Sequence, residues 1–168
     1  ATFYNLHAMT ELDLSGWDTG SVTKMDYVIA NNNNLETINL TGWDWSNVTS
    51  SIYAFRSNPK LVNVIGSGEW YMPKNTDLYG MFYNNPSIVT LDVSNWDTGS
   101  CTRYHDLFCA STALETIIGL ENWDTSSVTT MAHAFRCAYD IEELDLNSWD
   151  VSNVKEFNSM FSGTTNGN

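Results

Sequence analysis

The sequence has few basic residues, and this shortage excludes several kinds of partner. Lys and Arg together make up 7 of the 168 residues, against 20 Asp and Glu, so the net charge is −13. Such a polyanion is repelled by nucleic acid phosphates and by anionic lipid headgroups. No apolar run approaches the roughly 20 residues that span a bilayer. We therefore expect no nucleic acid partner and no membrane insertion.

Disulfide and catalytic patterns are also missing. The three cysteines are an odd number and give no disulfide framework, although Cys109 and Cys137 lie near equivalent turns and are the pair to consider for a bridge. No Ser/His/Asp or Cys/His set recurs, and no glycine-rich loop is present that would hold a phosphate. We expect no enzyme activity and no cofactor.

What the sequence does contain is tryptophan at a fixed spacing of 26 or 27 residues. The tryptophans that keep this spacing are Trp17, Trp43, Trp70, Trp96, Trp123 and Trp149. Twelve residues after each stands another apolar residue: Ile29, Phe55, Phe82, Phe108, Phe135 and Phe161. Self-similarity at a period of this length is typical of a solenoid, in which each repeat forms one coil stacked on the last. We number the coils 1 to 6 by their tryptophans.

Residues 1–168 are predicted to form a single repeat domain, which we expect to be monomeric. Phe3 occupies the place of Phe161 in the repeat, so the chain opens partway through a coil. No polar capping repeat, of the kind that shields the end of a solenoid, is visible. We therefore expect the domain to be a segment excised from a longer array.

The stretch after each tryptophan predicts a short helix. Counting from the tryptophan, apolar residues recur at offsets of five, eight, eleven and twelve, as Val22, Met25, Val28 and Ile29 do in coil 1. Spacings of three and four mark one face of a helix of about two to three turns. An Asn/Cys ladder that bonds the turn after this helix is expected at Asn31, Ser57, Asn84, Ala110 and Cys137.

The stretch before each tryptophan predicts a short strand, because its apolar residues alternate. These pairs are Leu12/Leu14, Ile38/Leu40, Leu91/Val93 and Leu144/Leu146. Coils 3 and 5 carry one extra residue, at Val64-Ile65-Gly66 and Ile117-Ile118-Gly119, which predicts a bulge or a widened turn. The predicted fold class is an α/β solenoid, leucine-rich-repeat-like, with six coils of 26–27 residues. Each coil would hold a short strand, a turn and a short helix, with the parallel strands stacked in one sheet.

Two segments carry a resemblance to a known family: LDLSGWDTGSVTKM at 12–25 and IIGLENWDTSSVTTM at 117–131. They are similar to the repeat of the BspA-like leucine-rich-repeat surface proteins of lactobacilli and other bacteria. The resemblance implies an extracellular protein, attached to the bacterial cell surface through parts of the parent absent here. It also implies adhesion to host mucin or matrix glycoproteins, and it supplies no binding residues.

Two patterns invite a metal ion, and for both we favour a structural role. Aspartate follows the tryptophan in five coils: Asp18, Asp44, Asp97, Asp124 and Asp150. We expect these aspartates to cap turns or helices, where their carboxylates accept backbone N–H groups. The alternative is a ladder of carboxylates that bind calcium. Cys101, His105 and Cys109 have the spacing of one helix face and invite zinc, but Cys101 holds a core valine position. No metal site is predicted.

The outward residues of the strands are the predicted ligand-binding face: Asp13, Asn39, Asp92, Asp145, Ser15, Thr41, Ser94 and Asn147. Their amides, hydroxyls and carboxylates can hydrogen-bond sugar hydroxyls. We therefore expect a non-enzymatic adhesion module that binds host mucus glycan or glycoprotein. The alternative is a structural spacer that presents another domain of the parent. If the glycan is acidic, binding should strengthen below about pH 5, where Asp begins to be protonated.

Overall fold

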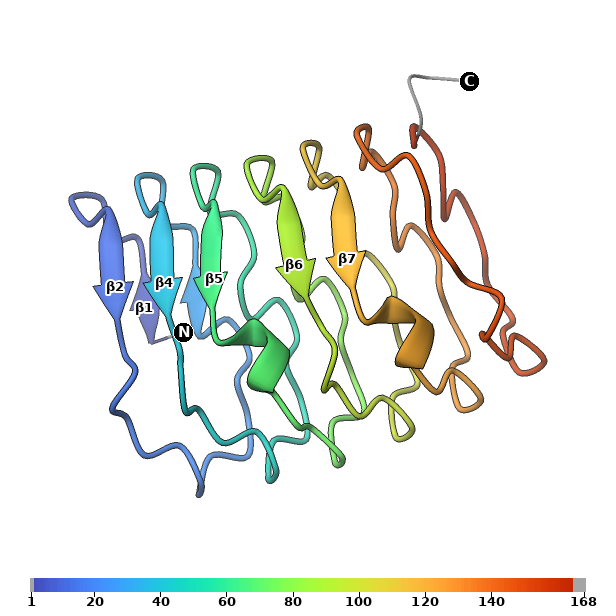
Figure 1. Ribbon diagram of the computed structural model, residues 1–168, viewed down its shortest axis with the longest axis horizontal. Helices are drawn as coiled ribbons and strands as arrows, with labels where there is room; N and C mark the ends of the chain where they lie inside the picture. The colour runs from blue at the N-terminus through green and yellow to red at the C-terminus, as the bar shows by residue number, and fades with distance from the viewer. Residues whose placement is uncertain (1, 165–168) are drawn as a thin grey trace.

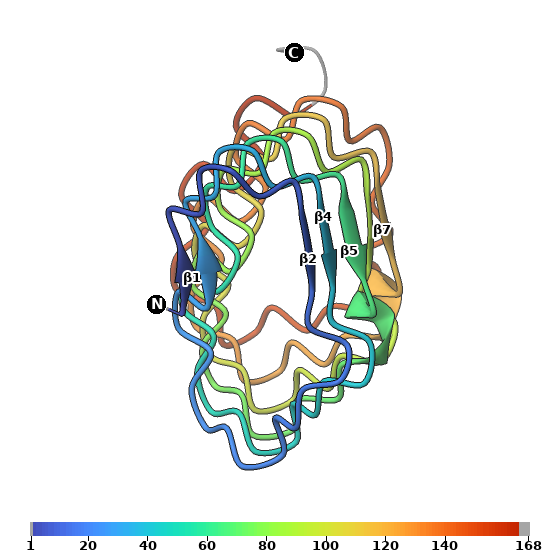
Figure 2. The same cartoon turned by 90° about the vertical axis from the view of Figure 1, so that its left-hand side faces the viewer.

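The structure, a computed structural model, describes residues 2–164 as coils laid side by side, one repeat to a coil (Figure 1). Viewed along the stack, the coils superpose into a flattened ring (Figure 2). The described residues form the strands β1 Phe3–Tyr4, β2 Glu11–Asp13, β3 Ile29–Ala30, β4 Thr37–Asn39, β5 Asn63–Ile65, β6 Thr90–Asp92 and β7 Thr116–Ile118, and the 3-10 helices η1 Ser67–Glu69 and η2 Leu120–Asn122. Within this range no helix is long and apolar enough to cross a membrane.

The strands that precede the tryptophans pair in parallel, in the register that the apolar pairs predict. Leu12 lies opposite Ile38 and Ile38 opposite Val64 in the sheet β2-β4-β5. Leu91 lies opposite Ile117 in the sheet β6-β7. β1 and β3 pair on the other long side of the ring (Figure 2). Parallel strands are thus confirmed, whereas the predicted single sheet is wrong, because the described strands form three small sheets.

The sheet stops after each coil that carries an extra residue. In coils 3 and 5 a glycine, Gly66 or Gly119, takes a left-handed φ of 91° or 90° and opens η1 or η2. This is the widened turn that the sequence predicts. Among the described strands β5 has no partner in coil 4 and β7 has none in coil 6. A Cβ on Gly119 would lie 2.3 Å from the Cα of Ser94, so only glycine fits this turn.

The predicted helix after each tryptophan is wrong, because this stretch forms rungs between coils instead. Alternate backbone N–H groups of coil 2 donate to carbonyls of coil 3: Ser51 to Asp77, Tyr53 to Tyr79 and Phe55 to Met81, at 3.2, 2.8 and 2.8 Å. The N–H of Ala54 turns back to the carbonyl of Ser51 at 3.1 Å. An α-helix would send all of these N–H groups four residues back along its own turn.

Two columns of left-handed residues explain why no helix forms. The tenth and fourteenth residues after the tryptophan have positive φ, as Tyr53 (51°) and Ser57 (57°) do in coil 2. Left-handed residues end a right-handed helix. The turns between them still bring side chains inward every three or four residues, so the predicted apolar positions of this coil are buried: Val48, Ser51, Ala54 and Phe55.

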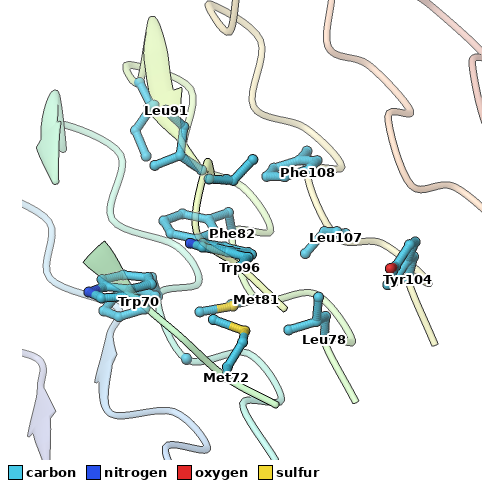
Figure 3. Packing of buried hydrophobic residues seen from close by; sticks show 14 of the residues in the cluster. Trp70, Met72, Leu78, Met81, Phe82, Leu91, Trp96, Tyr104, Leu107 and Phe108 are labelled. Carbon is cyan, nitrogen blue, oxygen red and sulfur yellow. The ribbon is translucent and has the colours of Figure 1, made fainter. Parts of the chain in front are cut away.

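Aromatic columns fill the interior of the inner coils. The rings of Trp70, Trp96 and Trp123 stack at centroid distances of 5.6 and 5.7 Å, with interplanar angles of 17° and 14°. Phe82 belongs to the neighbouring column, 6.2 Å from Trp96 (Figure 3). Trp17, in the first coil, is 52% exposed. The tryptophan column is therefore core in the middle of the stack and part of the surface at its first coil.

A buried asparagine ladder lies one residue after the predicted one. Asn32, Asn58 and Asn85 are fully buried. The Oδ1 of Asn58 accepts the N–H of Asn32 at 3.0 Å, and the Oδ1 of Asn85 accepts the N–H of Asn58 at 2.9 Å. The ladder predicted at Asn31, Ser57, Asn84, Ala110 and Cys137 is wrong by one residue. Those positions instead adopt the left-handed φ of 57° to 60° that ends the turn, a conformation asparagine tolerates.

Replacing Trp96 with Ala should lower the free energy of unfolding by about 3–5 kcal/mol, the usual cost of deleting a buried aromatic side chain. Trp96 is 3% exposed, and its indole N–H donates to the carbonyl of Ser67 at 2.9 Å. Trp17→Ala is the control from the same column, for which we expect about 1–2 kcal/mol, since half of that ring is exposed. Urea unfolding of both variants measures the difference, and equal losses would contradict this account of the core.

Candidate functional site

The eight residues of the predicted binding face form four local turns, which we call the strand-end row. In each turn the first side chain accepts the backbone N–H two residues on: Asp13 from Ser15 at 3.0 Å, Asn39 from Thr41 at 3.2 Å, Asp92 from Ser94 at 2.9 Å and Asp145 from Asn147 at 3.1 Å. These are Asx turns, in which a side chain replaces a backbone acceptor. The strand-end row therefore closes the strands and uses part of its hydrogen-bonding capacity on the chain itself.

The turns also change how the row responds to acid. The N–H of Ser15, and then its hydroxyl, lowers the pKa of Asp13. Protonation of this carboxylate therefore needs a pH below the ordinary aspartate value of about 3.9. A strengthening of acidic-glycan binding at about pH 5 is accordingly not expected from Asp13.

A more open site lies where the sheet stops after β7. A cleft of about 800 Å³ separates β7 from the first residues of coil 6, and we call it the coil 5–6 cleft. Its lining residues are Glu115, Thr116, Ile117, Tyr139, Asp140, Ile141, Glu142 and Glu143. The strand-end row does not line it. This cleft was not predicted from the sequence, and the one sequence signal beside it is the extra residue in coil 5.

The walls of the cleft combine carboxylates with one aromatic ring. Four of the lining residues are exposed acids: Glu115, Asp140, Glu142 and Glu143. The ring of Tyr139 is 45% exposed beside the buried Ile141. A hydrogen bond with the Cys137 side chain raises the pKa of Tyr139, so its phenol keeps its proton near neutral pH and can donate.

The edge of β7 adds backbone groups to the cleft. The N–H of Thr116 donates to the carbonyl of Val89 at 3.2 Å, on the side of β6. Neighbouring residues of a parallel strand bond to opposite sides, so the peptide groups of Ile117 face the side where no strand is paired. A ligand in the cleft meets carboxylate acceptors, a phenol and a free stretch of strand edge.

The aspartates that follow the tryptophans are held in turns. Each accepts the N–H two residues on: Asp18 from Gly20, Asp44 from Ser46, Asp97 from Gly99, Asp124 from Ser126 and Asp150 from Ser152, at 3.1, 2.8, 3.3, 2.9 and 2.9 Å. The contact is the one expected of caps, although it opens a turn and not a helix. Within residues 2–164 these carboxylates do not belong to a group that converges closely enough to hold an ion.

Three other side chains do converge, and we call them the histidine cluster: His105, Asp106 and His133, whose ligand atoms all lie within 4.8 Å of one another. Within residues 2–164 the zinc set weighed from the sequence does not converge as a ligand group, and Cys101 and Cys109 are buried. Burial raises the pKa of both thiols, that of Cys109 to about 12, so both keep their protons at neutral pH in the metal-free chain. Cys101, Cys109 and Cys137 are free thiols, and Cys109 is not bridged to Cys137.

The fold and the cleft together define a repeat protein of parallel, hydrogen-bonded coils with an acidic opening between two of them. One family model, described as "Mycoplasma protein of unknown function, DUF285", matches residues 1–119 and residues 76–168. The two matches together span the chain, so it belongs to this family. The comparisons with curated proteins and with solved structures give no match.

Changing Asp44, Asp124 and Asp150 together to Asn should alter how stability depends on pH. The serine two residues on lowers the pKa of each carboxylate, through its hydroxyl first at Asp44 and Asp124 and through its N–H first at Asp150. A folded-state pKa below the unfolded value stabilises the protein above about pH 4, and this contribution disappears as the pH falls through the folded-state pKa.

We therefore expect the melting temperature of the wild type to exceed that of the triple variant at pH 6, and the difference to vanish near pH 2. Asn retains the acceptor oxygen, so the turns themselves are kept. Thermal melts from pH 2 to 7 measure the difference. A gap between the two proteins that stays constant over this range would show that the three carboxylates have the same pKa folded and unfolded.

Proposed function

We propose that this chain is a cell-surface adhesion module whose coil 5–6 cleft binds an uncharged glycan of host mucus or of a host glycoprotein. The observation that carries the proposal is the composition of the cleft, which places an exposed tyrosine among carboxylates in a space of about 800 Å³. That volume falls within the range of pockets that hold small molecules, roughly 300–1,000 Å³.

The chemistry of the cleft favours sugar hydroxyls over charged groups. An ionised carboxylate only accepts hydrogen bonds, and sugar hydroxyls are donors that match it. The amphipathic ring of Tyr139 offers an apolar face for the C–H side of a pyranose and a phenol that can donate. Sialylated or sulfated sugars would bring negative charge toward Glu115, Glu142 and Glu143, in a protein whose net charge is −13. An uncharged glycan is therefore the better match.

We extend the proposal to the fold class of the protein and to its place on the cell. We take the coils to form a solenoid related to the BspA-like leucine-rich-repeat surface proteins. This is supported by the register of β2, β4 and β5, by the asparagine ladder and by a repeat that one family model matches along the chain. The module would be displayed outside the cell, attached to the bacterial surface through other parts of its parent, and would act as a monomer on host mucin or matrix glycoprotein.

A second function, a structural spacer, is favoured by the strand-end row. Its aspartates and Asn39 already accept N–H groups of their own coils, which leaves less capacity for a ligand. A spacer needs only a solvated surface and a stiff stack, since its task is to hold another domain of the parent away from the cell.

Binding of the chain to immobilised mucin, before and after removal of sialic acid, separates the two functions. We expect the wild type to bind desialylated mucin more tightly, because removing sialic acid removes charge repulsion. Tyr139→Ala should weaken binding about tenfold, as truncating an interface anchor does. Biolayer interferometry at physiological ionic strength measures both effects.

Tyr71→Ala is the matched control, because Tyr71 is 56% exposed and does not line the cleft. Its affinity should equal that of the wild type. Equal binding by the wild type and Tyr139→Ala would move the ligand site away from the cleft. No binding by the wild type to either mucin would favour the spacer.

A further inference from the structure

The histidine cluster lies on a different part of the coils from the cleft and the strand-end row. His105 and Asp106 are the ninth and tenth residues after Trp96, and His133 is the tenth after Trp123. Asp106 and His133 are thus the same position in successive coils, which the stacking brings side by side. His105 and His133 stand one position apart in the repeat, so spacing alone does not place them in one column.

Backbone rungs fix the three residues relative to one another. The N–H of Asp106 donates to the carbonyl of Ala132 at 3.0 Å, and the carbonyl of His105 accepts the N–H of Gly80 at 2.9 Å. The N–H of His133 donates to Asn158 of coil 6 at 2.9 Å. The cluster therefore stands on a scaffold that is hydrogen-bonded on both sides, which holds a ligand set better than a loop does.

The fold does not require these residue types at this position. The column of tenth residues contains Tyr27, Tyr53, Gly80, Asp106, His133 and Ser159, and all of them have positive φ. Tyrosine, glycine and serine therefore satisfy the same backbone. Two imidazoles and a carboxylate that converge in coils 4 and 5 need an explanation beyond coil geometry.

The distances within the cluster are those of a metal site. The Nε2 of His105 lies 3.4 Å from Oδ2 of Asp106, and the Nδ1 of His133 lies 3.4 Å from Oδ1. Two ligands bound to zinc at about 2.0–2.1 Å in tetrahedral geometry stand about 3.3–3.4 Å apart. Each imidazole lies beside a different oxygen of Asp106, and the three ligand atoms lie within 4.8 Å of one another, so small side-chain rotations would bring them to the spacing of one ion.

We propose that His105, Asp106 and His133 bind one Zn²⁺ ion between coils 4 and 5, with the fourth position open to water or to a group from a partner. Imidazole nitrogen and carboxylate oxygen are ordinary zinc ligands, and three protein ligands with an open position are common for this ion. The side chains are 28%, 15% and 29% exposed, so an ion can enter from solvent and is partly shielded once bound.

Zinc titration of the metal-free chain, followed by calorimetry and by thermal melting, tests the proposal. We expect one ion per chain and a melting temperature that rises by about 5–10 °C at free zinc a hundred times the Kd, because a native-state ligand stabilises by mass action. Cobalt(II) bound at the same site should show d–d bands without a thiolate charge-transfer band, which separates this ligand set from one that contains Cys101 or Cys109.

His133→Asn and Asp106→Asn should each weaken zinc binding by at least about tenfold and abolish most of the melting shift. Asn tolerates the left-handed backbone at both positions, where φ is 59° and 57°, so both variants should fold. If His133→Asn fails to fold, Asp106→Asn still tests the proposal. His7→Asn, which removes a histidine outside the cluster, should bind zinc as the wild type does. The proposal is overturned if zinc leaves the wild-type melting temperature unchanged, or if His133→Asn and Asp106→Asn retain wild-type affinity.

Discussion

The structure depends on the hydrogen bonds that pass from the backbone of one coil to the next. Rungs such as Tyr53 to Tyr79 hold successive coils in register, and the parallel strand pairs do the same on the opposite side of the ring. Register is what places like residues above like residues. The tryptophan stack and the buried asparagine ladder both follow from it, since each needs the same side chain at the same place in successive coils. A repeat that shifted by one residue would lose both.

One added residue is enough to interrupt this arrangement locally. Gly66 and Gly119 extend coils 3 and 5, and the sheet ends after each of them. The hydrogen bonds of the indole N–H groups also differ beside the two insertions. Trp43, Trp96 and Trp149 donate to a carbonyl of the preceding coil, while those of Trp70 and Trp123, which follow the two insertions, are buried without a partner. Regular bonding is thus lost beside both insertions, and the coil 5–6 cleft lies at the second of these breaks in the sheet.

The period of the sequence predicted which side chains are buried, but not the backbone that buries them. Apolar residues at spacings of three and four are compatible with a helix and with a series of tight turns. The left-handed backbone of Tyr53 and Ser57 favours turns over a helix. A positive φ cannot be predicted from tyrosine or serine, because neither residue type prefers it. The asparagine ladder was misplaced by one residue for the same reason, since both Asn31 and Asn32 are asparagines and only the backbone separates their roles. Asp13, Asn39 and Asp92 end described strands, whereas no strand is described at Asp145. The Asx turns of the strand-end row depend on side-chain rotation that no spacing encodes.

Polar side chains at regular positions in such a stack hydrogen-bond the backbone of the chain itself, so outward chemistry concentrates where the repeat departs from its pattern. The aspartates after the tryptophans illustrate the regular case, because each of the five accepts a backbone N–H of its own turn. The cleft lies beside the break in the sheet that follows the longer coil 5. The histidine cluster exists because coils 4 and 5 hold Asp106 and His133 in a column where coils 1 and 2 hold tyrosine. At these irregular positions the outward side chains differ from coil to coil, while the rungs, the tryptophans and the asparagine ladder keep the coils in place.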